Sequence, residues 1–96
     1  MSFEDFRASI AAGTPPAGAG PALLALWHDA RGQWDRAHEV AQEAGNRDGD
    51  WVHAYLHRKE GDEGNAGYWY ARARKPAASG ELAAEWEAIA RALLAG

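Results

Sequence analysis

The sequence predicts an all-α protein, and three observations lead to that prediction. Alanine contributes 23 of the 96 residues, and like leucine, glutamate and arginine it favours helix because its side chain loses little freedom there. The β-branched residues that favour strands are nearly absent, with two valines, two isoleucines and one threonine. Apolar residues also recur at spacings of three and four, which places them on one face of a helix.

The first predicted helix covers residues 3–12. Ser2 can cap its first turn, and Asp5 stands three residues later, in the place that completes a capping box. Residues 13–20 form a linker, because two adjacent prolines and three glycines cannot continue a helix. A second helix begins near Pro21, since the first turn of a helix does not need the N–H that proline lacks.

Glycine or proline separates the four remaining predicted helices, which cover residues 34–44, about 48–60, 63–74 and a segment that follows Ser79. Gly45 and Gly61 suit the left-handed ends of two of them. Ser79 is expected to cap the last helix. This helix carries an apolar stripe of Leu82, Trp86, Ile89 and Leu93.

Composition excludes several classes of function. The absence of cysteine rules out disulfides, a thiol nucleophile and an iron–sulfur cluster. A net charge of −4 argues against nucleic acid as a partner, and no apolar run approaches the ~18 residues that a membrane span needs. We therefore expect one cytoplasmic domain over residues 1–96, with neither nucleic-acid nor membrane binding.

An internal repeat organises the middle of the chain. Residues 20–44 match residues 49–73 at an offset of 29 positions, and both units have a helix–glycine–helix rhythm. The identical pairs are Gly20/Gly49, Ala25/Ala54, His28/His57, Gly32/Gly61, Ala37/Ala66 and Ala44/Ala73. A helical hairpin of this length cannot bury its apolar face alone, so the two units are expected to stack.

This pattern resembles the tetratricopeptide and Sel1-like repeats. Those repeats place small residues where two helices touch and a glycine at the turn, as Ala25, Gly32 and Ala37 do here. Residues 65–73, NAGYWYARA, are also similar to part of a Sel1 unit. The resemblance implies two stacked hairpins with N- and C-terminal capping helices, and a role in binding a protein or peptide. The strings LWHDARG and WVHAYLHRKEGD further resemble a family of small bacterial proteins that has no assigned function.

The repeat register implies a concave groove formed by the first helix of each unit. The residues that fall on it are Leu26, Asp29, Trp51, Tyr55, Arg58 and Lys59. An aromatic and basic surface of this kind suits a peptide or an acidic partner. The same residues could equally form an ordinary solvated face.

A second hypothesis is a metal site on the fourth predicted helix. His53 and His57 are four residues apart and share one face, and Glu60 adds an oxygen one turn further on. Such a set could bind a divalent metal such as zinc, with His28 or His38 approaching from the other hairpin. Alternatively, the histidines pack between helices and bond to backbone or carboxylate groups.

Nothing in the sequence indicates an active site. Alanine follows His53 where a zinc protease has its general base, no serine lies in a nucleophile elbow, and no phosphate loop is present. We therefore expect no catalytic residues and, in the first hypothesis, no cofactor. A homodimer is possible through the apolar stripe of the last helix, although that stripe could instead pack on its own core.

Overall fold

The computed structural model describes residues 1–96 and contains helices but no strands, which confirms the all-α prediction. Six α-helices follow one another: α1 (Phe3–Ala12), α2 (Pro21–Ala30), α3 (Trp34–Ala44), α4 (Arg47–Glu60), α5 (Glu63–Ala73) and α6 (Leu82–Ala95). None of them combines the length and apolar character that crossing a membrane requires.

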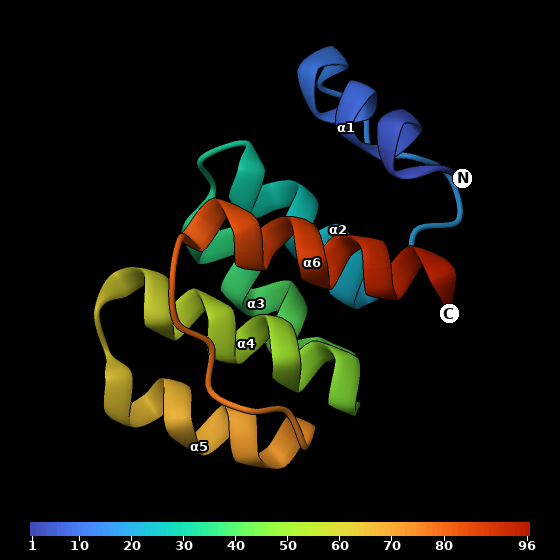
Figure 1. The fold of residues 1–96 in the computed structure, drawn as a ribbon. Coiled ribbons are helices and arrows are strands. Elements are labelled where there is room, and N and C mark those ends of the chain that lie inside the picture. The colour runs from blue at the N-terminus through green and yellow to red at the C-terminus, as the bar shows by residue number, and fades with distance from the viewer.

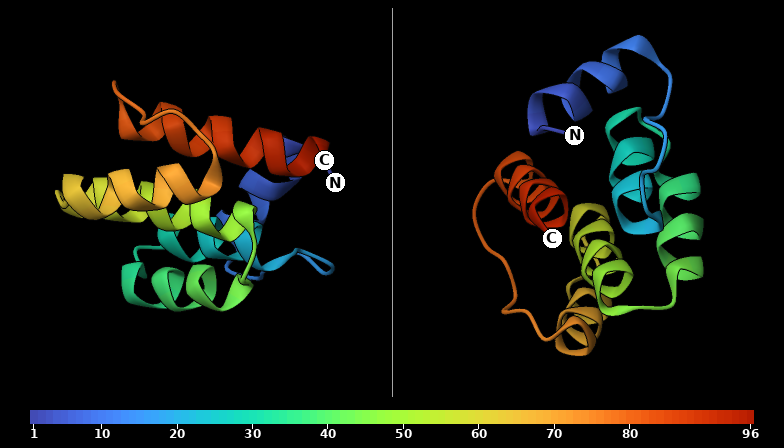
Figure 2. Two further views of the ribbon diagram at one scale, coloured as in Figure 1. Left: turned by 90° about the horizontal axis from the view of Figure 1, so that it is seen from below. Right: turned by 90° about the vertical axis from the view of Figure 1, so that its right-hand side faces the viewer.

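Consecutive helices pack side by side through the middle of the chain. Helix α2 packs against α3, α3 against α4, and α4 against α5 (Figure 1). Helix α6 returns across this layer and contacts both α2 and α4, while α1 lies on the outer side of α6 (Figure 2). Helix α4 therefore touches four other helices and is the centre of the fold.

The predicted helix ends agree closely with the structure, with one exception. The capping box at Ser2 forms in both directions, and Gly45 and Gly61 end their helices in the left-handed conformation. Ser79 does not cap α6, which begins at Leu82 after Glu81. Gly80, which would be the first residue of a helix capped by Ser79, has a φ of 89°. This left-handed conformation is incompatible with a right-handed helix at that position.

The terminal helices also differ from the caps that the repeat resemblance implied. Helix α6 lies along α2 and α4 instead of closing an open end of the layer. Its Trp86 ring stacks on Phe6 of α1 at a centroid distance of 5.8 Å and meets Phe3 edge-on at 6.1 Å. Phe6 and Ile89 are fully buried, so α1 and α6 extend the same core.

The contact between α3 and α4 is unusually close at Gly49. A Cβ atom placed on this glycine would lie 2.5 Å from Ala44 Cβ and 2.8 Å from the backbone oxygen of Ala41. Both distances are shorter than any normal contact, so this crossing depends on the missing side chain. Ala37 and Ala41 are also buried on α3, so this helix contributes small side chains to its packing interfaces.

We expect Gly49→Ala to lower the free energy of unfolding by about 1–3 kcal/mol, the usual range for overpacking, although alanine is the better helix former. The matched control is Gly67→Ala in α5, where an added Cβ would meet nothing within 4 Å. That variant should gain up to about 1 kcal/mol from helix propensity. Urea denaturation of both variants measures the difference, and equal stabilities would contradict the assigned contact.

Candidate functional site

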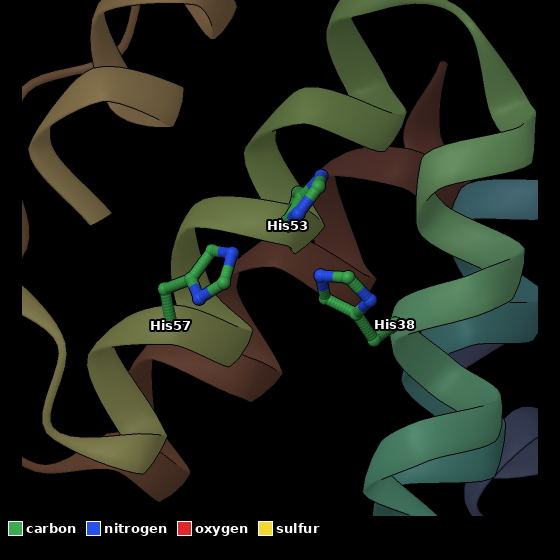
Figure 3. Close-up of side chains that lie close together, drawn as sticks. All are labelled: His38, His53 and His57. Atoms are coloured by element: carbon green, nitrogen blue, oxygen red, sulfur yellow. The ribbon is translucent and has the colours of Figure 1, made fainter. Parts of the chain in front are cut away.

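Three imidazole rings meet between α3 and α4. His38 lies in the middle of α3, while His53 and His57 lie on successive turns of α4 and project from the same side. Each ring contributes one nitrogen atom, and these three nitrogens lie within 4.8 Å of one another. Figure 3 shows the rings facing one another across the space between the two helices. We call His38, His53 and His57 the three-histidine centre.

The turn between α3 and α4 sets up this meeting. Gly45 ends α3 with a φ of 64°, and Asn46 caps α4 by accepting a hydrogen bond from the Gly49 amide at 2.8 Å. Because only these two residues separate the helices, the chain reverses at once and α3 packs along α4. His38 is thereby carried beside His53 and His57.

Two tryptophans enclose the three-histidine centre. Trp69 of α5 stacks on His53, with ring centroids 3.9 Å apart and planes 15° apart. Trp34 stacks on His38 at 5.1 Å and 14°, and its indole nitrogen donates to the Leu56 carbonyl at 3.0 Å. Each indole is half-buried and also packs against one of the two core clusters.

His53 is the most deeply buried member of the centre. It is 3% exposed, and its Nδ1 atom is buried without a hydrogen-bond partner. A neutral imidazole carries one donor and one acceptor, and buried polar atoms of this kind are nearly always paired. The centre therefore contains a nitrogen whose bonding capacity the protein itself leaves unused.

His57 has a partner on its outer side. Its Nδ1 atom lies 2.6 Å from Oε2 of Glu60, one turn further along α4. The neighbouring carboxylate of Asp62 is engaged elsewhere, because it accepts from the Asn65 amide at 3.1 Å and from the Asn65 side chain at 2.7 Å. Glu60 is thus the carboxylate that bonds directly to the centre.

Burial keeps two of the rings uncharged near neutral pH. The pKa of His53 is lowered to about 4, first by burial and then by the neighbouring His38, His57 and Arg72. Burial, followed by repulsion from His57, also lowers the pKa of His38 below its usual value of 6.5. Neutral rings present a free lone pair, which is the form that binds a metal ion.

The structure brings some of the predicted metal-ligand candidates together and separates others. His53 and His57 lie on one face of α4, and the third histidine beside them is His38. His28 lies elsewhere, with its Nδ1 atom 2.8 Å from the Gln33 side chain. Glu60 bonds to His57, but its carboxylate is not part of the cluster that the three rings form. The sequence names His38 only as one of two options, since spacing along the chain does not fix the register between helices.

The six residues of the predicted groove do not form an open surface, because α6 lies over most of them. Leu26, Asp29 and Tyr55 are buried. Trp86 of α6 donates to the Leu26 carbonyl at 3.0 Å. Trp51 is half-buried against the same core, with the Lys75 ammonium 4.2 Å from its ring centroid.

The two basic residues of the predicted groove are engaged within the protein. Arg58 pairs with Glu85 of α6 at 2.9 Å. Lys59 pairs with buried Asp29 at 2.9 Å, and Tyr55 donates to the same carboxylate at 3.0 Å. A cavity of about 270 Å³ remains beside Asp29, Tyr55 and Lys59, where α6 begins. The groove is thus largely filled by the protein's own helix.

The apolar stripe of α6 is likewise directed inward. Ile89 is fully buried, and Leu82, Trp86 and Leu93 are half-buried against the main core. A homodimer through this stripe would require α6 to leave that core. The alternative that the sequence also allows, packing on its own domain, is the arrangement observed.

No protein-family model, curated protein or solved structure matches this chain. The resemblance to tetratricopeptide and Sel1-like repeats therefore stays a prediction. Function has to be inferred from the chemistry of the three-histidine centre.

We expect the free energy of unfolding to fall as pH falls from about 6.5 towards 4. In this range the unfolded chain protonates His53 at the usual value of 6.5, whereas the folded protein does so only near a pKa of about 4. Acid therefore favours the unfolded state. Urea denaturation at several pH values measures the slope.

Two variants isolate the contribution of His53 to this slope. His53→Gln should show a shallower loss of stability in acid, because glutamine stays neutral. His28→Gln removes a histidine outside the three-histidine centre and should keep the wild-type slope. A His53→Gln profile identical to that of the wild type would contradict the assignment.

Proposed function

We propose that this protein binds a divalent transition-metal ion at the three-histidine centre, with His38, His53 and His57 as the protein ligands. The observation that carries the proposal is the convergence of three imidazole nitrogens around a buried ring whose Nδ1 atom has no partner. Three histidines are a recurrent ligand set for zinc, and helical spacing of four fixes the separation of two of them.

The geometry suits a small ion. A tetrahedral ion that binds imidazole nitrogens at ~2.0–2.1 Å holds those nitrogens roughly 3.3 Å apart. The three nitrogens here lie within 4.8 Å of one another, so each ring has to move inward by less than about 1 Å. Side-chain rotation accommodates such a shift without moving α3 relative to α4.

The ligand chemistry selects the class of metal. Three imidazole ligands favour Zn²⁺, Co²⁺, Ni²⁺ or Cu²⁺, whereas Mg²⁺ and Ca²⁺ prefer oxygen ligands. The low pKa values of His53 and His38 support the same proposal, because protons then compete weakly with the metal at neutral pH.

A fourth position on the ion is left for water. Three protein ligands and one open position are typical of catalytic zinc sites, in contrast to the four protein ligands of structural sites. His38 is only half-buried, so the centre is not sealed from solvent on the side of α3.

Binding of a protein or peptide, the function that the repeat resemblance implies, stays a prediction. The face that would serve it is occupied by α6, and the contacts of Arg58 and Lys59 would have to be broken for a partner to bind there. The three-histidine centre needs no such rearrangement, and for that reason we favour metal binding.

We expect the chelator-treated protein to bind one Zn²⁺ per chain and to bind Mg²⁺ far more weakly. Isothermal titration calorimetry and elemental analysis after dialysis measure the stoichiometry. At a free zinc concentration 100 times the dissociation constant, binding should add about 2.7 kcal/mol to the free energy of unfolding.

Single substitutions define the ligands. His38→Ala, His53→Ala and His57→Ala should each weaken zinc binding by more than ~100-fold, because loss of a direct ligand exceeds the usual effect of losing an outer-shell partner. His28→Ala, which removes a histidine outside the centre, should bind like the wild type. A wild-type protein without stoichiometric zinc, or a His38→Ala variant with unchanged affinity, would refute the proposal.

A further inference from the structure

Glu60 touches the three-histidine centre from the side facing away from the metal position. Its Oε2 atom lies 2.6 Å from Nδ1 of His57. The His57 side chain is 11% exposed and the Glu60 side chain 39%, so the bond joins a buried ring to a carboxylate at the surface. Glu60 lies in the last turn of α4, which ends at Gly61, and its backbone is therefore fixed.

The bond determines where the proton on His57 resides. A carboxylate has only acceptor sites, so Nδ1 of His57 must carry the hydrogen and donate it. In the neutral ring the other nitrogen, Nε2, then holds the lone pair. Of the two His57 nitrogens, only Nε2 is free to bind an ion while this contact persists.

We propose that Glu60 is a positioning residue of the three-histidine centre, whose carboxylate holds His57 in the Nδ1–H tautomer and so selects Nε2 as the metal-binding atom. The proposal rests on the metal binding proposed above and deepens it. Metal-bound histidines commonly donate their second nitrogen to a carboxylate, which fixes the ring orientation and makes the binding nitrogen more basic.

An ordinary ion pair on a helix surface would have different consequences. Glutamate and histidine three residues apart can pair when the ring is protonated, and such pairs contribute only weakly to helix stability. A pair of that kind would change stability slightly and leave both metal affinity and the tautomer of the neutral ring unchanged. Tautomer and affinity therefore separate the two roles.

The first measurement is the tautomer of His57 in the metal-free protein. Long-range proton–nitrogen NMR correlation should place the hydrogen on Nδ1 in the wild type. In Glu60→Ala the carboxylate is gone, and the population should shift towards the Nε2–H form that free imidazole side chains prefer. A wild-type His57 with its hydrogen on Nε2 would overturn the proposal.

The second measurement is zinc affinity, determined by competition with a chromophoric chelator. Glu60→Ala should weaken Zn²⁺ binding by about 10–100-fold, the usual effect of removing such a partner. Glu60→Gln keeps an acceptor for the Nδ1 hydrogen but lacks the charge, so its loss should be smaller than that of Glu60→Ala. Wild-type affinity in Glu60→Ala would overturn the proposal.

The control is Glu63→Ala, which removes an exposed carboxylate from the first turn of α5 and changes the net charge equally. It should keep both the wild-type tautomer and zinc affinity, so that a general charge effect is separated from the specific contact. Circular dichroism melts establish that each variant is folded. Failure of the wild type to bind zinc would refute the metal site itself, whereas unchanged affinity in Glu60→Ala alone would refute only the role of Glu60.

Discussion

The close packing of α3 against α4 is the constraint on which the candidate site depends. Gly49 lets the two backbones approach at Ala41 and Ala44, where a side chain would overlap with neighbouring atoms. This contact and the two-residue turn before α4 set the register between the helices. His38 meets His53 only in that register. A shift of one helical turn would carry it roughly 5.4 Å along the interface and separate the rings.

Helix α4 has two faces with different polar chemistry. Towards α2 and α6, Tyr55 and Lys59 bond to buried Asp29, while Arg58 and Tyr70 of α5 bond to buried Glu85. Each buried carboxylate thus has a cationic and a phenolic partner, which compensates the loss of water. Burial and the adjacent carboxylates raise the pKa values of both tyrosines, so they remain donors. The buried polar groups on this face all have partners, whereas the histidine face contains the unpaired Nδ1 atom of His53.

Local pattern was sufficient to predict most of the helices, and it also predicted that His53 and His57 share a face. These features depend on residues close in sequence, such as Ser2 with Asp5 or Gly45 after α3. The choice of His38 over His28 could not be predicted, because it depends on which faces of α2 and α3 pack against α4. The position of α6 could not be predicted either. Its apolar stripe specifies burial but not which surface provides it, so the sequence did not show that most of the groove residues lie under α6.

An unpaired buried nitrogen distinguishes the three-histidine centre from the rest of the protein interior. Among the buried side-chain nitrogen and oxygen atoms, Nδ1 of His53 alone lacks a partner. Leaving such an atom unpaired costs about 1–3 kcal/mol, a substantial part of the stability of a small domain. An apolar side chain of similar size would avoid that cost while still stacking on Trp69. Sites where a protein accepts a local cost of this kind are often functional. A metal ion bound within the centre would give the surrounding imidazoles the partner that the protein itself does not supply.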